Sequence, residues 1–258
     1  MKIFQGIPFY NYFSNKNDNV NIKVFSYYKS IQRDLKADGI DLILGFIGSE
    51  GDISKRLVES LLDDSSFYYE FCQENKTLAD KFNYCLEVGK EFDPDMYCIS
   101  GSNDMVTKIF YSILDKSKDL SGVSWSDTGV NYIIDINSRS SFLSKGKYQS
   151  GLFNGVDHSK LQLVGGIYAL SKRFLDICSW KPFSLPYDEV GMEYSIYSIF
   201  KDLNLEVNGL SHPDLKLYNI KGNYDLTGYD LCKQIHFYRD LNEEEINYFF
   251  KMWEELKI

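Results

Sequence analysis

The amino-acid sequence predicts an α/β fold with a mostly parallel central sheet flanked by helices. Over the first half of the chain, short apolar segments alternate with longer amphipathic segments. Strands that alternate with helices pair in parallel, because a parallel pair needs a crossover connection that is usually a helix. Two of the apolar segments end in glycine followed by polar residues, which is typical of ligand-binding loops at the carboxyl edge of such a sheet.

The first half of the chain contains the regular part of this pattern. Strands are expected at 2–9, 40–47, 67–71 and 96–100, and helices at 20–36, 53–62, 77–90 and 106–114. Val24, Tyr27 and Ile31 recur at helical spacing within the first helix and give it one apolar face. Asp52 precedes the second helix, where the helix dipole favours a negative charge.

The second half of the chain is less regular. Strands are expected at 122–125, 132–136, 161–170 and 205–210, and helices at 171–178, 192–203 and 242–258. Residues 137–160 are rich in Ser, Gly and Lys, and a long loop is expected there. The last helix carries Ile246, Phe249 and Trp253 on one face, which we expect to pack against the core rather than against a partner or a membrane.

Composition and charge exclude several classes of function. The chain has 258 residues, of which 44% are hydrophobic, so a full hydrophobic core is expected. Its net charge of −9 repels a phosphate backbone and disfavours binding to DNA or RNA. Five widely spaced cysteines without a C-x-x-C pair predict neither a zinc site nor a disulfide framework, which favours a cytoplasmic protein. We expect no signal peptide and no membrane span.

Three polar segments follow predicted strands, at 8–11 (Pro-Phe-Tyr-Asn), 48–51 (Gly-Ser-Glu-Gly) and 101–104 (Gly-Ser-Asn-Asp). The carboxyl ends of parallel strands meet at one edge of a sheet, so these segments are expected to converge. Asn103 and Asp104 offer the hard oxygen ligands that Mg²⁺ and Mn²⁺ prefer, although the same residues are common in ordinary turns. Dinucleotide-binding and P-loop glycine motifs do not occur in the sequence.

Five segments together resemble the glycosyltransferases of the GT-A fold. Segments 7–11, 75–83 and 98–104 are similar to the first strand, the K-x-N helix and the acidic metal motif of the nucleotide-sugar half, and 163–176 and 191–205 are similar to the acceptor half of inverting members. The order and spacing of these segments carry the resemblance, which covers most of residues 1–240. Small viral and phage-borne members also resemble this chain, which would place such a protein in the host cytoplasm.

The resemblance implies a single GT-A-like domain over residues 1–258. Its nucleotide-sugar-binding half would cover 1–120, its acceptor-binding half 121–240, and a C-terminal helix 241–258. The implied reaction moves a sugar from a UDP-, GDP- or dTDP-sugar to a hydroxyl of a carbohydrate or glycoconjugate acceptor, with Mn²⁺ or Mg²⁺ as cofactor.

The resemblance also implies roles for individual residues. Asp104 would bind the metal ion, with His212 as a further ligand. Glu193 would deprotonate the attacking hydroxyl, with Asp188 as the competing base. Contacts to the nucleotide sugar would come from the three strand ends and the helix at 77–90, namely from Pro8, Tyr10, Glu50, Lys81, Asn83, Ser102 and Asn103.

The sequence departs from the family pattern at one position, and several of the candidate residues also have a simpler structural interpretation. Asn103 stands where a second acid is usual, so metal binding would be weaker or dispensable. Glu193 also suits the start of a helix, Lys81 a solvated helix face, and His212 a surface turn. Two other functions compete: a nucleotidyltransferase that makes a nucleotide sugar, and a catalytically weakened module that only binds one.

Overall fold

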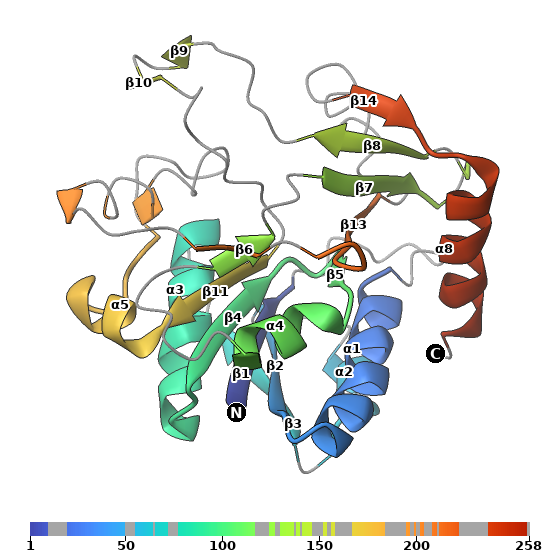
Figure 1. Ribbon diagram of the computed structural model, residues 1–258. Helices are drawn as coiled ribbons and strands as arrows, with labels where there is room; N and C mark the ends of the chain where they lie inside the picture. Colours follow the sequence, from blue (N-terminus) through green and yellow to red (C-terminus); the bar gives the residue numbers. More distant parts are fainter. Residues whose placement is uncertain are drawn as a thin grey trace.

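The computed structural model contains a seven-stranded central sheet with the strand order β12-β6-β11-β4-β1-β2-β3 (Figure 1). Six of these strands run in the same direction and β11 runs opposite, so the predicted mostly parallel sheet is confirmed. The structure describes residues 1–9, 20–49, 55–63, 65–71, 77–116, 124–126, 130–136, 138–139, 141–145, 152–153, 156–157, 167–183, 195–196, 199, 202–203, 208–210, 212–221 and 237–256.

The strands of the central sheet are β1 (Lys2–Pro8), β2 (Asp41–Ser49), β3 (Ser66–Phe71), β4 (Met96–Ser100), β6 (Ser124–Ser126), β11 (Ile167–Ser171) and β12 (Asn208–Leu210). The helices are α1 (Val20–Ala37), α2 (Lys55–Glu59), α3 (Leu78–Gly89), α4 (Ile109–Lys116), α5 (Lys172–Ile177) and α8 (Glu243–Glu255), with a 3₁₀ turn at Lys90–Phe92. The alternation predicted for the first half is therefore confirmed, apart from shifts of a few residues at the boundaries.

Helices cover both faces of the central sheet. Along β1, Ile3 and Ile7 pack into one core with residues of α1, α4 and α8, whereas Phe4 packs into a second core with residues of α3 and α5. Alternate residues of β2 and β4 are divided between the same two cores. Burial on both faces explains why these strands are almost continuously apolar rather than alternating.

A second sheet, with the order β14-β8-β7-β13-β5, lies beyond the carboxyl edge of the first (Figure 1). Its strands are β5 (Asp104–Val106), β7 (Val130–Asp135), β8 (Ser141–Lys145), β13 (Leu217–Lys221) and β14 (Phe237–Asp240). Strands β9 (Leu152–Phe153) and β10 (Val156–Asp157) form a separate antiparallel pair. The loop expected over 137–160 is thus wrong where β8, β9 and β10 lie. Helix α4 starts later than expected because β5 occupies the preceding residues, and β13 and β14 were not predicted.

Helix α8 lies alongside the second sheet (Figure 1). Its side chains Phe249, Phe250 and Trp253 are buried in the first core, which confirms the expected core packing. Asn242 and Glu245 form a capping box that satisfies backbone N–H groups at its start. Among the described residues, no helix has both the length and the apolar character that a membrane crossing requires.

Gly6 allows α3 to lie close against β1. A Cβ atom added to Gly6 would stand 2.8 Å from Cβ of Cys85, and both atoms are fixed by their backbones. We expect Gly6→Ala to lower the free energy of unfolding by about 2 kcal/mol, because extra atoms in a packed core force the backbone to shift. Urea denaturation would measure this change, and an unchanged midpoint would contradict the close packing.

Candidate functional site

Lys81 of α3 reaches the carboxyl ends of β1 and β2. Its ammonium donates hydrogen bonds to Oγ of Ser49 at 2.7 Å and to the backbone oxygen of Phe9 at 3.3 Å. The residue is only 4% exposed, so a solvated helix lysine, the simpler interpretation, is wrong. Thr77 and Asp80 fix the start of the helix through a capping box. A buried cation therefore lies where the parallel strands end.

The segment from Gly101 to Asp104 joins β4 of the central sheet to β5 of the second sheet. The amide of Asp104 donates to the oxygen of Gly101 at 3.2 Å, which closes a tight turn. Asn103 then pairs with β13, because its backbone oxygen accepts from the amide of Ile220 at 2.8 Å and its side-chain Nδ2 donates to the Ile220 oxygen at 3.1 Å. Residues from both halves of the chain thus meet at this turn.

Asp104 is buried, and its carboxylate is held from the second half of the chain. Nδ2 of Asn219 donates to Oδ1 of Asp104 at 2.6 Å. The hydroxyl of Tyr28 donates to the backbone oxygen of Asp104 at 2.9 Å. Burial raises the pKa of Tyr28 well above its usual value, so the phenol stays protonated and remains a donor.

A buried polar network lies behind the turn. Nε2 of Gln5 donates to Oγ of Ser100 at 2.8 Å, and the hydroxyl of Tyr111 donates to Oε1 of Gln5. Burial also raises the pKa of Tyr111. Because buried polar groups with satisfied hydrogen bonds fix one arrangement, this network holds the end of β4 rigidly.

The oxygens of Asp104 and Asn103 converge over Gly101. A Cβ atom added to Gly101 would lie 2.5 Å from Oδ2 of Asp104 and 3.2 Å from Oδ1 of Asn103. Two hard oxygens on one side of a glycine fit a divalent cation that takes its other ligands from water and phosphate. Across the described part of the chain, no cluster of three His, Cys, Asp or Glu residues could hold a metal ion by itself.

The structure places two further predicted residues, Asn83 and His212, outside this convergence. The side-chain amide of Asn83 is hydrogen-bonded to the backbone of Phe183. Its Nδ2 donates to the Phe183 oxygen at 2.6 Å, and its Oδ1 accepts from the Phe183 N–H at 3.1 Å, so it connects α3 to the segment after α5. His212 accepts from the amide of Asp214 in a turn beyond the Thr107 end of β5, and Asp104 is at the other end of that strand. The structure therefore does not bring His212 and Asp104 together.

The remaining predicted residues are divided between described and undescribed segments. Pro8 is buried in β1 opposite Ile47, and Ser102 is half-buried in the turn before Asp104. Four of the predicted residues lie outside the described residues, namely Tyr10, Glu50, Asp188 and Glu193.

The sequence reasoning did not find Asn219. Tyr218 and Ile220 alternate with the polar Asn219 and Lys221, which is the pattern of a half-buried strand and was the signal available. No local pattern links this strand to Asp104, because the two residues are far apart in the chain.

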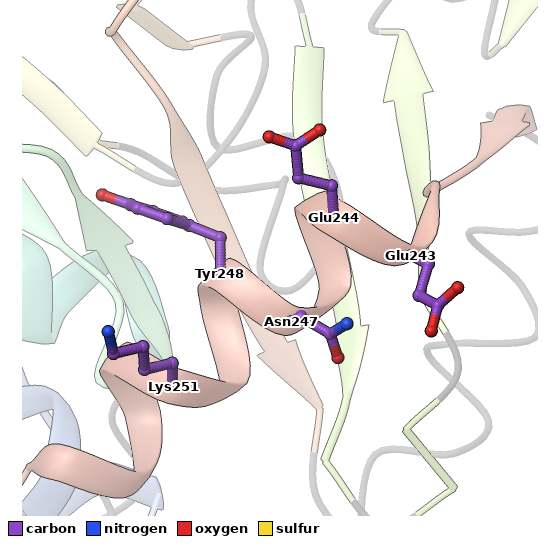
Figure 2. A pocket seen from close by; sticks show the side chains of 5 residues that line it. All are labelled: Glu243, Glu244, Asn247, Tyr248 and Lys251. Carbon is purple, nitrogen blue, oxygen red and sulfur yellow. The ribbon is translucent and has the colours of Figure 1, made fainter.

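A pocket on the outer surface of α8 lies away from these strand ends. It is lined by polar and aromatic side chains of that one helix, Glu243, Glu244, Asn247, Tyr248 and Lys251 (Figure 2). Figure 2 shows these side chains spread along the helix rather than converging on one point. We place the candidate site at the strand ends instead, where buried charged and amide groups from several elements meet.

The chain is similar in structure to several solved proteins, among them a nucleotide-bound protein and a nucleotide-dependent transferase. S. aureus TarS 1–349 in complex with UDP has 13% identity and a TM-score of 0.53, over 99% of this chain and 70% of that one. The inositol-1-phosphate CTP transferase from T. maritima has 14% identity and a TM-score of 0.50, over 100% of this chain and 98% of that one. No protein-family profile and no curated protein sequence matches the chain.

These likenesses, with the strand order, show that the chain has the GT-A-like fold of nucleotide-diphospho-sugar transferases. The fold expected from the sequence resemblance is thereby confirmed. At 13% and 14% identity, the structural likeness shows the fold alone. The substrate has to be inferred from the chemistry of the site.

Proposed function

We propose that this protein is a glycosyltransferase that binds a nucleoside-diphosphate sugar at the carboxyl edge of the central sheet. The observation that carries the proposal is the pair of buried charges at that edge, Lys81 beside the ends of β1 and β2 and Asp104 after β4. A buried ammonium suits a diphosphate, and a buried carboxylate suits the cation that accompanies it. UDP is the first nucleotide to test, because TarS was solved with UDP.

The chemistry places negative charge on the leaving diphosphate. Lys81 would face this charge, and Asp104 with Asn103 would hold a Mn²⁺ or Mg²⁺ ion. When bound, that ion supplies Lewis-acid stabilisation of the leaving group. A carboxylate on the opposite side of the sugar, Glu193 or Asp188, would take the proton of the acceptor hydroxyl. The acceptor oxygen would then bond to the anomeric carbon from the face opposite the departing diphosphate, which inverts that centre.

The direct experiment is an assay of hydrolysis and transfer from UDP-, GDP- and dTDP-sugars in the presence of Mn²⁺. We expect one nucleotide to raise the thermal midpoint and its sugar derivative to turn over. Neither turnover nor a thermal shift with any nucleotide would contradict the proposal. Binding without turnover of any sugar would favour the weakened binding module instead.

A nucleotidyltransferase is the second candidate, because the T. maritima CTP transferase is matched over almost its whole length. Such an enzyme joins a nucleoside triphosphate to a sugar phosphate and releases pyrophosphate. Its usual first loop is rich in glycine with Arg or Lys, whereas residues 6–10 read Gly-Ile-Pro-Phe-Tyr. Pyrophosphate release from CTP or UTP with a sugar phosphate would identify this activity.

A substitution at Gly101 tests whether the oxygens of Asp104 and Asn103 hold a cation. We expect Gly101→Ala to weaken Mn²⁺-supported nucleotide binding about tenfold, because its Cβ would displace the Asp104 carboxylate. Calorimetric titration with UDP and Mn²⁺ would measure the loss. Asn247→Ala, on the exposed face of α8, serves as the control. Unchanged affinity in Gly101→Ala would contradict the placement of the cation.

A further inference from the structure

Asn219 lies directly opposite Asp104 in the second sheet. Strand β13 runs antiparallel to β5, and Asn219 is the register partner of Asp104. Its Nδ2 donates to Oδ1 of Asp104 at 2.6 Å. This short hydrogen bond to a carboxylate is charge-assisted and therefore fixes the orientation of both side chains.

The direction of the Asn219 amide is set by its chemistry. If the amide were rotated by half a turn, its Oδ1 would face Oδ1 of Asp104, and two acceptors at that distance repel. The nitrogen must therefore face the carboxylate, and the amide oxygen must point elsewhere.

The amide oxygen of Asn219 is buried and has no hydrogen-bond partner among the residues that the structure describes. A buried acceptor without a partner lowers stability, so proteins seldom keep one without a use. This acceptor belongs to the same amide that holds Asp104. The other oxygen of the Asp104 carboxylate, Oδ2, is one of the two oxygens that converge over Gly101.

The opposite face of β13 is fully occupied by the core. Tyr218 and Ile220 pack among the residues that α8 covers. Because side chains alternate along a strand, Asn219 shares the other face with Lys221. The same face carries Leu217, which is buried in the first core, and Asp135 is the register partner of Lys221 on β7.

We propose that Asn219 is a further member of the binding site, with one role for each atom of its amide. The N–H group positions the carboxylate of Asp104, and the carbonyl oxygen is a ligand for the divalent cation of a metal–diphosphate complex. The inference deepens the proposed function and rests on it. It adds a residue from the second half of the chain to a cation site whose other proposed ligands, Asn103 and Asp104, come from the first half.

Two substitutions at Asn219 separate this role from a structural one. Asn219→Asp has nearly the same shape but places a second carboxylate against Asp104. We expect its thermal midpoint to fall in metal-free buffer and to recover with MnCl₂, because a divalent cation bridges the two charges. Asn219→Leu removes both amide atoms, and we expect about 10- to 100-fold weaker Mn²⁺ binding in the presence of UDP. Asn247→Asp, on the exposed face of α8, is the matched control.

The outcomes distinguish this inference from the proposed function. If Asn219→Asp gains no more from MnCl₂ than Asn247→Asp does, the amide oxygen does not face a cation site. If the wild-type protein binds UDP with Mn²⁺ and Asn219→Leu binds them equally well, only the role of Asn219 is overturned. If the wild-type protein binds no nucleotide, the proposed function itself fails. Circular dichroism of each variant confirms that the fold is retained.

Discussion

Asp104→Asn is expected to reduce sugar transfer by about 10³-fold while leaving the protein folded. The change removes the one carboxylate charge that the described residues place at the turn after β4. A cation held there stabilises the leaving diphosphate by several kcal/mol, and each 1.36 kcal/mol is a factor of ten in rate. Steady-state kinetics with the active nucleotide sugar and Mn²⁺ would measure the loss, which should appear in kcat.

The choice of asparagine separates charge from structure. Asparagine keeps an oxygen that accepts from Asn219, so the hydrogen bond that orients the site survives. Asp104→Ala, in contrast, leaves the Nδ2 donor of Asn219 buried without a partner and should also cost about 1–3 kcal/mol of stability. Glu243→Gln removes an exposed carboxylate from α8 and serves as the control for net charge. An Asp104→Asn enzyme with at least half the wild-type rate would overturn the metal role of Asp104.

The first half of the fold could be predicted because its signals are local. In helix α1 and in strands β1, β2 and β4, the buried side chains follow an apolar pattern that is visible within the segment itself. The position of the candidate site at the carboxyl edge followed from topology alone, because neighbouring parallel strands end at the same edge of a sheet. The expected convergence of the strand ends is confirmed where Lys81 joins Ser49 and Phe9.

The second sheet could not be predicted in the same way. Strand β5 is only three residues long, and its stability comes from pairing with β13 rather than from its own pattern. The contact between Asn219 and Asp104 joins residues 115 positions apart, and that between Asn83 and Phe183 joins residues 100 apart. Such contacts depend on tertiary packing, so Asn83 was predicted at the ligand although the structure uses its amide within the fold.

The buried position of Lys81 had a local signal that sequence reasoning did not use. Lys81 precedes Cys85 by one helical turn, and Cys85 is fully buried against Gly6. A lysine on the buried face of an amphipathic helix needs a reason, because removing an ammonium from water is costly. Its hydrogen bonds to Ser49 and Phe9 hold the ammonium at the two strand ends, where we propose that the diphosphate binds.

Lys81→Met is therefore expected to weaken nucleotide binding by about 100-fold, or about 2.7 kcal/mol, with little change in stability. Methionine nearly conserves the volume of lysine and removes its charge. The substitution removes the hydrogen bonds to Ser49 and Phe9, but it also removes the cost of burying an ammonium. Because the two effects oppose each other, the free energy of unfolding should stay within about 1 kcal/mol of wild type. Calorimetric titration with UDP and urea denaturation would measure the two quantities separately.

The two measurements decide between a ligand role and a structural role for Lys81. A lysine that only bridges β1 and β2 would lose stability on substitution, and its nucleotide affinity would fall no further than partial unfolding explains. A lysine that faces the diphosphate would lose affinity alone, and Lys81→Arg would recover part of it because the charge returns. Lys36→Met, on the exposed side of α1, tests whether a general loss of positive charge has the same effect. Equal affinity in Lys81→Met and wild type would remove Lys81 from the site.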